Sequence, residues 1–281
     1  MSENNNLLSL VLRPWTLDLR TMRVLAGTAA TIAVLTPPQS VLLTFAPRLC
    51  GPMPRFIHRT ICRLIGVRVR TLGAPVQRGP VLYIANHMSW LDIPIIGSRV
   101  EGSFVARADM NEWGMFKYLC RLQRTIFVER DRRHRSMDQR DEIIDRLAAN
   151  DQVILFPEGT TSNGNRLLPF KSALFSVAEA AIARGIDLKV QPVTLAYTRL
   201  NNIPMGRAMR AKLAWVGDED LNPHFKKVLR LGRIEALLHF HQPVRPQDFA
   251  CRKALAQHCE GVIGQSLRQA NGGRACTAPD A

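Results

Sequence analysis

The sequence predicts an α/β protein in which helices flank a central, mostly parallel sheet, preceded by an apolar helical segment. Short apolar runs alternate with helical runs along most of the chain, and a stretch of 24 uncharged residues precedes them. Alternation of this kind is typical of a buried sheet covered on both faces. Of the 281 residues, 46% are hydrophobic and 22% are charged. This is ordinary for a folded globular protein and excludes a disordered chain.

Short apolar runs between turn residues indicate strands. They lie at residues 67–72, 81–85, 103–106, 125–128, 153–156, 188–196, 212–216 and 234–240. Helical spacing occurs at residues 135–150 and 171–184, and Gly185 offers an exit from the second helix. Near the C-terminus, Asp248 is expected to cap a helix that runs to about Ala270. Residues 271–281 are expected to form a disordered tail.

The uncharged stretch spans residues 24–47 and is bracketed by Arg23 and Arg48. As a helix it would extend roughly 36 Å, enough to cross a bilayer with some tilt. Pro37 and Pro38 stand in its middle, and each arm beside them is too short to span alone. We therefore expect membrane contact, either as a span or as a bent insertion into one leaflet. A helical pair buried on the soluble core is the alternative.

The chain is strongly basic, with a net charge of +15. Six arginines and no acidic residue occur from Arg48 to Arg70, beside the apolar stretch. Such a flank predicts attraction to an anionic membrane surface. Nucleic acid is the less favoured partner, because Phe56 is the single aromatic residue among these arginines. The expected organisation is a membrane-associated segment at 1–66, a catalytic domain at 67–270 and the tail.

The six cysteines, at positions 50, 62, 120, 251, 259 and 276, form no C-x-x-C pair and have no zinc-like spacing. Free thiols in a reduced, cytosolic setting are the simplest interpretation. The first residues lack the basic region of a cleavable signal peptide. His239 and His241 share a strand face without a neighbouring carboxylate or thiol, so no metal site is expected.

The run NHMSWLD at residues 86–92 directly follows an apolar strand. A neutral imidazole at His87 can take a proton from an alcohol, and the carboxylate of Asp92 can hold its tautomer and stabilise the imidazolium. This pair suits transfer of an acyl group to a hydroxyl. The alternative is structural, because Ser89 and Asp92 have the spacing of a helix capping box.

The run FPEGTTS at residues 156–162 also follows a strand. Gly159 permits close backbone approach, so its N–H and the hydroxyl of Thr160 could hold an anionic group, and Glu158 could orient a polar one. A simple strand-to-loop turn is the alternative. At the tip of another strand, Arg130 could grip a phosphate with two hydrogen bonds.

In this order, N-H-x-x-x-x-D, I-F-V-x-R at 126–130, F-P-E-G-T-T-S and V-Q-P-V at 190–193 resemble the glycerolipid acyltransferase family. Its best-known members are the lysophosphatidic acid (1-acyl-sn-glycerol-3-phosphate) acyltransferases. The resemblance covers roughly residues 67–244. It implies the layered fold of that family and an acyltransferase activity.

The resemblance also implies roles for single residues. His87 would be the general base and Asp92 its partner. Arg130 would bind the acceptor phosphate, and Pro192 would lie in the motif linked to the acyl donor. The implied substrate-binding residues are Asn86, Phe127, Arg130, Glu158, Gly159, Thr160 and Pro192.

The implied reaction is attack by a lysolipid hydroxyl on the thioester of acyl-CoA or acyl-carrier protein, without metal or other cofactor. The first expectation is conversion of 1-acyl-sn-glycerol-3-phosphate to phosphatidic acid. Residues 214–224 look like a bacterial branch that includes lyso-ornithine-lipid acyltransferases, which is the alternative. Arg130 would then need another partner, because ornithine lipids have no phosphate. The resemblance places the enzyme at the inner membrane, with the catalytic domain facing the cytoplasm.

Two departures and one rival class bear on this interpretation. Ala173 stands where many relatives carry glycine, and Glu129 stands where aspartate is common. Neither departure touches the proposed catalytic pair, but both bear on the identity of the acceptor. A serine hydrolase is disfavoured, because no G-x-S-x-G occurs and Ser89 is too close to His87 in sequence for an ordinary triad.

Overall fold

The computed structural model describes residues 19–46, 52–107, 120, 122–128, 133–217 and 221–273. The described part of the chain forms one sheet in the order β1-β8-β6-β2-β5-β3-β4, with β7 paired to β6. The strands are β1 (Val67–Leu72), β2 (Val81–Ala85), β3 (Ser103–Arg107), β4 (Ile126–Val128), β5 (Gln152–Leu155), β6 (Lys189–Leu200), β7 (Ile203–Pro204) and β8 (Ile234–Phe240).

The sheet is mostly parallel. β2 pairs in parallel with β5 on one side and with β6 on the other, and β3 pairs in parallel with β5 and β4. β8 runs antiparallel to β6 and parallel to β1, so the last two strands point the other way. The α/β fold class with a mostly parallel sheet is thereby confirmed.

β2 lies at the centre of the sheet because its sequence, VLYIA, is apolar on both faces and buried throughout. Its side chains alternate between two core clusters. Leu82 and Ile84 join the cluster under one face, and Tyr83 and Ala85 join the cluster under the other. A strand buried on both sides is a rigid support for the residues that follow it.

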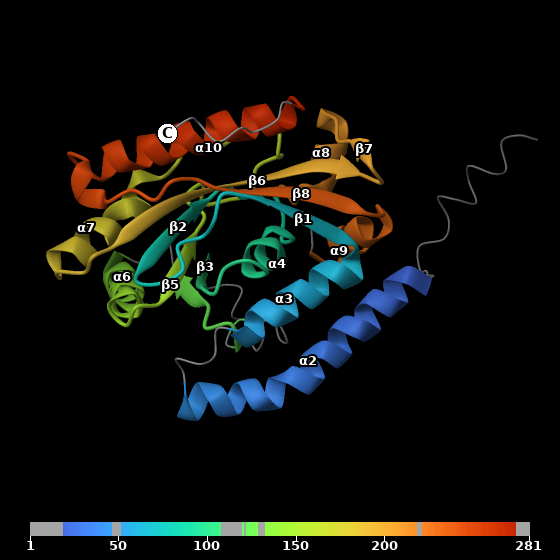
Figure 1. Cartoon of the computed structure of the whole chain (residues 1–281), viewed down its shortest axis with the longest axis horizontal. Helices are drawn as coiled ribbons and strands as arrows, with labels where there is room; N and C mark the ends of the chain where they lie inside the picture. The colour runs from blue at the N-terminus through green and yellow to red at the C-terminus, as the bar shows by residue number, and fades with distance from the viewer. Residues whose placement is uncertain are drawn as a thin grey trace, which may run out of the picture.

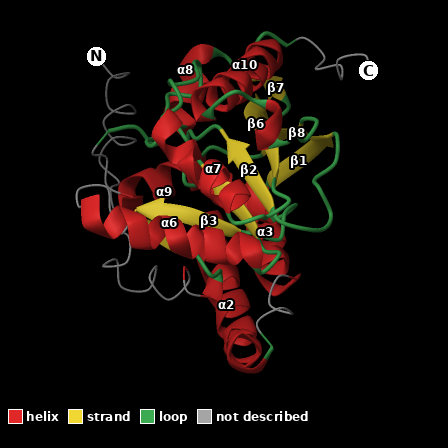
Figure 2. Cartoon of the chain, turned by 90° about the vertical axis from the view of Figure 1, so that its left-hand side faces the viewer, coloured by secondary structure: helices red, strands yellow, loops and turns green. Residues whose placement is uncertain are grey.

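Helices cover both faces of the sheet (Figures 1 and 2). One face carries α6 (Arg133–Ala148), α7 (Ser176–Ala183) and α10 (Arg252–Asn271), whose apolar residues form one cluster with β2 and β5. The other face carries α3 (Pro52–Ile65), α4 (Asp92–Gly97) and α9 (Leu221–Arg230), whereas α8 (Arg207–Leu213) lies beside α10 (Figure 1) and contributes Leu213 to the cluster of that other face. Short 3₁₀ turns, η3 (Ser172–Phe175) and η4 (Pro246–Asp248), precede α7 and α10.

The apolar N-terminal stretch forms a single helix, α2 (Leu19–Phe45), which packs along α3 and bends along its length (Figure 1). Pro37 and Pro38 lie inside it and supply a physical reason for a bend, because proline removes a helical hydrogen bond. Among the described residues, α2 is the one helix long and apolar enough to cross a membrane by length and composition. Most of its surface points away from the protein (Figure 2).

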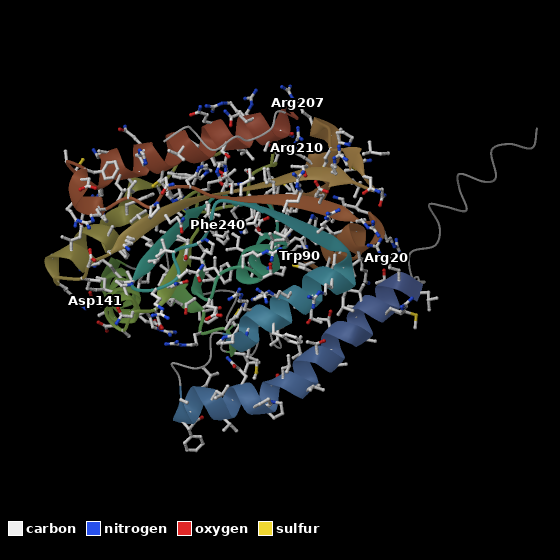
Figure 3. All side chains as sticks on the ribbon, in the orientation of Figure 1. Arg20, Trp90, Asp141, Arg207, Arg210 and Phe240 are labelled. Atoms are coloured by element: carbon white, nitrogen blue, oxygen red, sulfur yellow. The ribbon has the colours of Figure 1, made fainter. Side chains whose placement is uncertain are left out.

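A partly buried contact joins the start of α2 to the body of the protein. Nη2 of Arg20 donates to the carbonyl of Ile65 at 2.8 Å and to that of Gly232 at 2.7 Å (Figure 3). Cys62 and Ile65 of α3 belong to the core cluster beneath the sheet. The division of the chain at residue 66 stays a prediction, and α3 packs as part of the folded core.

Two expectations about elements are wrong. Residues 212–216 form no strand. Lys212 belongs to the last turn of α8, and the backbone N–H of Trp215 donates to the carbonyl of Met88 instead of to a neighbouring strand. Asp248 does not cap the last helix, because it lies in η4 and α10 begins at Arg252 after Cys251. The described cysteines, at positions 62, 120, 251 and 259, are free thiols.

Candidate active site

The loop after β2 is tied to its neighbours on both sides. The side-chain amide of Asn86 donates to the carbonyl of Leu195 at 2.9 Å and accepts from its N–H at 2.8 Å, which locks the loop to β6. On the other side, the N–H of Ser162 donates to the carbonyl of His87 at 2.8 Å. The two runs singled out from the sequence, residues 86–92 and 156–162, therefore lie side by side.

His87 and Asp92 form a hydrogen-bonded pair. Nδ1 of His87 lies 2.8 Å from Oδ2 of Asp92. Asp92 is completely buried in the first turn of α4, whereas 18% of the His87 side chain is exposed. No described residue hydrogen-bonds Nε2 of His87. With Nδ1–H assigned as the donor to the carboxylate, the lone pair of Nε2 is free to accept a proton.

The carboxylate of Asp92 accepts four hydrogen bonds. Besides His87, Oδ2 accepts the N–H groups of Met88 at 2.6 Å and Ser89 at 2.9 Å. Oδ1 accepts the hydroxyl of Tyr197 at 2.5 Å. Four hydrogen-bond donors around one carboxylate compensate for its burial.

The expected capping box is half present. Asp92 reaches back to the N–H of Ser89, as the acidic member of a capping box does, but Oγ of Ser89 caps nothing. The N-cap position of α4 is Leu91, with no side-chain cap. The same carboxylate therefore both shapes the loop and holds the imidazole.

Glu158 lies on the inner side of the loop and is 2% exposed. Oε1 accepts the N–H of His87 at 2.7 Å, and Oε2 accepts the N–H of Leu168 at 2.9 Å. Burial raises the pKa of Glu158 to about 7; of the smaller contributions to this value, the two backbone N–H donors lower the pKa and the charges of Asp92 and Glu260 raise it. Both carboxylate oxygens are thus bonded to the backbone around His87.

Glu158 should make the stability of the fold depend on pH. Its pKa is higher in the folded protein than the ordinary value of 4.5, so the folded state holds the proton more tightly. The contribution of Glu158 to the free energy of unfolding should therefore be greatest below pH 4.5 and fall by up to about 3 kcal/mol as the pH rises through 7. Glu158→Gln should remove this component, measured by denaturant titrations at pH 4.5 and pH 7 in detergent.

Glu179→Gln is the control for this experiment, because the Glu179 side chain is 48% exposed and lies on α7. That variant should retain the pH dependence of the unmodified protein. An equal fall in unfolding free energy for Glu158→Gln and the unmodified protein would contradict the assigned protonation of Glu158.

Gly159 adopts a φ of +72°, which favours glycine, and its surface is covered by a lysine. A Cβ at this position would lie 2.8 Å from Nζ of Lys171. The N–H of Gly159 itself bonds the carbonyl of Phe156 at 3.2 Å, so it is occupied within the turn. The side chain of Thr160 is exposed beside it. The exposed side of the bend therefore presents an ammonium group and a hydroxyl.

Several aromatic residues that were not among the predicted site residues lie in or contact the His87 loop. The ring of Phe156 stacks on the imidazole with ring centroids 4.2 Å apart and planes tilted by 16°. Trp215 bonds the loop through the carbonyl of Met88 at 2.9 Å. Trp90, on the α3 side of the sheet, donates to Nδ1 of His224 at 3.2 Å (Figure 3). Phe156 and Trp90 stood in the quoted motifs, and Trp215 stood in the segment that resembles the ornithine-lipid branch, but no sequence signal marks Tyr197.

Three of the implied substrate-binding residues have no hydrogen bond to the His87 loop in the described structure or lie outside it. Phe127 lies in the edge strand β4, opposite Ala106, and is partly exposed. Pro192 lies buried in β6, opposite Ile84 of β2. Arg130 lies outside the described residues.

The two strand histidines, His239 and His241, lie with ring centroids 4.0 Å apart. They bond hydroxyls, those of Ser266 at 3.1 Å and Thr194 at 2.8 Å. Burial lowers the pKa of His241 to about 3, with smaller contributions from neighbouring histidines. Within the described ranges, no group of three or more metal-binding side chains occurs.

Comparison with known proteins identifies relatives that match most of the length of this chain. The family model described as Acyltransferase matches residues 66–196. A lyso-ornithine lipid O-acyltransferase of Brucella abortus is 41% identical over 259 residues, covering 90% of this chain and 97% of that protein. A second enzyme of that name, from Rhizobium meliloti, is 41% identical over 84% of this chain and 80% of that protein.

More distant relatives share part of the chain or the fold alone. A 1-acyl-sn-glycerol-3-phosphate acyltransferase of Neisseria gonorrhoeae is 36% identical over 47% of this chain and 50% of that protein. The crystal structure of the 1-acyl-sn-glycerophosphate acyltransferase PlsC from Thermotoga maritima superimposes with a TM-score of 0.60 at 22% identity. That match covers 89% of this chain and 97% of the other. With a relative 41% identical along nearly its whole length, this chain belongs to the PlsC-like acyltransferase family.

Proposed function

We propose that His87 and Asp92 catalyse transfer of a fatty acyl group from a thioester to the free hydroxyl of a lysolipid. The observation that carries this proposal is the 2.8 Å contact between Nδ1 of His87 and Asp92, with Nε2 unoccupied by any described residue. A histidine oriented in this way is a general base. Among the residues that the structure describes, no serine or cysteine side chain hydrogen-bonds the imidazole of His87, so we infer that transfer proceeds directly to the acceptor.

In the proposed reaction, Nε2 of His87 takes the proton of the acceptor hydroxyl as its oxygen attacks the thioester carbonyl. The imidazolium is stabilised by the carboxylate of Asp92, which is held in place by its other three donors. Collapse of the tetrahedral intermediate breaks the carbon–sulfur bond, and the thiolate leaves with the proton from the imidazolium. The products are the ester and a free thiol, and His87 returns to its neutral form.

Similarity favours lyso-ornithine lipid as the acceptor over 1-acyl-sn-glycerol-3-phosphate. Relatives named for the first activity match most of this chain, whereas the Neisseria protein named for the second matches 47% of it. This reverses the order of preference reached from the motifs alone. The segment around Trp215, which resembles the ornithine-lipid branch, contacts the His87 loop and therefore has the position needed to influence acceptor choice.

An acceptor panel tests this function. Purified enzyme in detergent is given radiolabelled acyl-CoA or acyl-carrier protein together with lyso-ornithine lipid, 1-acyl-sn-glycerol-3-phosphate or lysophosphatidylcholine. We expect the highest kcat/KM with lyso-ornithine lipid. A higher value with 1-acyl-sn-glycerol-3-phosphate would reject that acceptor, and no transfer to any lysolipid would reject the lysolipid acyltransferase function. Comparison of the two donors identifies the thioester used.

The geometry divides the motif residues between positioning and contact. The polar side-chain atoms of Asn86 and Glu158 hydrogen-bond the backbone, so we propose that these two residues position the loop. The turn at Gly159, with Thr160, forms the exposed side of the bend, and Lys171 supplies a positive charge there for an anionic acceptor group.

Phe127, Arg130 and Pro192 keep the roles that the family resemblance implies. Phe127 and Arg130 are proposed to act on the acceptor side and Pro192 on the donor side. The two candidate acceptors differ in the anionic group that they offer to Arg130. A phosphate would engage the guanidinium of Arg130 with two hydrogen bonds, whereas the carboxylate of lyso-ornithine lipid offers a second possible anion for it.

We further propose that α2 holds the enzyme on an anionic membrane, with the catalytic domain at the cytoplasmic face of the inner membrane. The outer side of α2 exposes large apolar side chains: Leu19, Met22, Leu25, Val34, Val41 and Phe45. Arginines of α3 lie alongside, which suits anionic head groups. The fatty chains of the lysolipid acceptor and of the product would lie in the same membrane, so an anchored enzyme would be held next to them.

The α2 proposal predicts a change in membrane association. Val34 and Val41 are 70% and 57% exposed, so Val34→Asp with Val41→Asp should leave the fold intact while making insertion of α2 unfavourable. Sedimentation with vesicles containing anionic lipid should fall by at least about tenfold. Ile203→Asp, at an exposed apolar residue on β7, is the matched control and should sediment normally. Equal sedimentation of all variants would reject the role of α2.

A further inference from the structure

Asp92 receives one hydrogen bond that none of the sequence motifs contains. Its Oδ2 atom accepts from the imidazole and the loop backbone, whereas Oδ1 accepts, among the described residues, only the hydroxyl of Tyr197, at 2.5 Å. We propose that Tyr197 is a positioning residue for acyl transfer, which fixes the rotation of the Asp92 carboxylate so that Oδ2 faces His87. This inference rests on the proposed function of the pair.

Tyr197 is placed firmly enough to perform this task. It lies in β6, is 1% exposed and belongs to the same core cluster as Tyr83 and Leu195. Because side chains two positions apart share a face of a strand, Leu195 and Tyr197 lie on the same side of β6. The backbone of Leu195 binds Asn86, and the hydroxyl of Tyr197 binds Asp92. One strand therefore holds the loop at both ends of the catalytic run.

The hydroxyl is suited to donate permanently. Burial raises the pKa of Tyr197 well above its ordinary value, and the adjacent charge of Asp92 raises it further. Tyr197 thus stays protonated and acts as a donor to a carboxylate. A short hydrogen bond from a neutral hydroxyl to a buried carboxylate is stronger than one between neutral groups.

Without this donor, Oδ1 would be left in the core with no partner among the described residues, and the carboxylate could rotate. Rotation would weaken the contact with Nδ1 of His87, which would orient the imidazole less well during proton transfer. Substrates bind outside this buried contact, so the proposal predicts loss of kcat rather than of substrate binding.

The test is a double-mutant cycle in the full-length enzyme, with Tyr197→Phe, Asp92→Asn and both together. Tyr197→Phe should lower kcat about tenfold, while KM for donor and acceptor stays within about twofold. The double variant should be no slower than Asp92→Asn, because Tyr197 has then lost the group that it positions. Thermal unfolding of each variant is followed in parallel.

Tyr83→Phe is the matched control. Tyr83 is also fully buried, but its hydroxyl bonds the carbonyl of Val76 at 2.9 Å, away from His87. It should lower the unfolding temperature to a similar extent and leave kcat unchanged. An equal loss of kcat in the two Tyr→Phe variants would mean a general structural effect and would overturn the proposal.

The remaining outcomes separate this proposal from the catalytic pair. Losses that multiply in the double variant would show that Tyr197 acts independently of Asp92 and would overturn its positioning role. An inactive Asp92→Asn beside an unimpaired Tyr197→Phe would overturn the role of Tyr197 alone. A fully active Asp92→Asn would overturn the catalytic pair itself, and this inference with it.

Discussion

His87→Ala is expected to lower kcat for acyl transfer by at least about 10³-fold, with little change in folding or membrane association. The substitution removes the only side chain of the proposed pair that can take the proton of the acceptor hydroxyl. The ring is partly exposed, and the carbonyl and N–H of residue 87 would still bond Ser162 and Glu158. Initial rates with saturating thioester and lysolipid measure the effect.

His258→Ala is the control for this prediction. His258 lies on α10, on the other face of the sheet, where its ring contacts Phe249. It should retain full activity. If His87→Ala kept more than about a tenth of the unmodified kcat, another group would have to act as the base, and the proposed mechanism would be wrong.

Asp92→Asn is expected to cost about 10²–10⁴-fold in kcat. An amide at position 92 can offer only one acceptor oxygen, whereas the loop and His87 together present three donors to Oδ2 alone. If the amide turns its NH₂ group toward Nδ1 of His87, it stabilises the tautomer that carries the proton on Nε2, which cannot act as a base. The loss should appear in kcat for every acceptor alike.

The carboxylate is also structural, so unfolding must be measured with activity. We expect Asp92→Asn to lower the free energy of unfolding by roughly 1–3 kcal/mol, because two loop N–H groups and the Tyr197 hydroxyl lose a charged acceptor. Asp248→Asn, at an exposed residue in η4, should change neither quantity. A folded Asp92→Asn variant with full activity would contradict the role assigned to this carboxylate.

The strands around the site could be predicted closely because their apolar runs are short and bounded by turn residues. Residues 67–72, 81–85 and 234–240 are strands with the predicted limits. The same pattern wrongly predicted a strand at residues 212–216. Periodicity cannot distinguish a short apolar run of a strand from the buried end of a helix, and here the buried residues are Leu213, at the end of α8, and the following Ala214.

For the apolar N-terminal stretch, too, the sequence determined part of the structure and the tertiary contacts determined the rest. Its length and lack of charge were visible in the sequence, but the sequence left a span, a bent insertion and a buried pair open. Tertiary structure decided that residues 19–45 form one helix through Pro37 and Pro38, held at its start by Arg20. The contacts that place α2 on α3 involve backbone carbonyls from distant segments, which no local pattern contains.

From the sequence alone came the fold class, the acyltransferase family and the spacing that makes His87 and Asp92 candidates, because local patterns and short motifs record them directly. Tertiary structure decided which polar side-chain atoms are bonded to the backbone of the loop. Glu158 and Asn86 are bonded to backbone groups, and Tyr197 reaches Asp92 across 105 positions of sequence. Such contacts depend on strand order and on the face of each strand, and these arise only when the sheet is assembled.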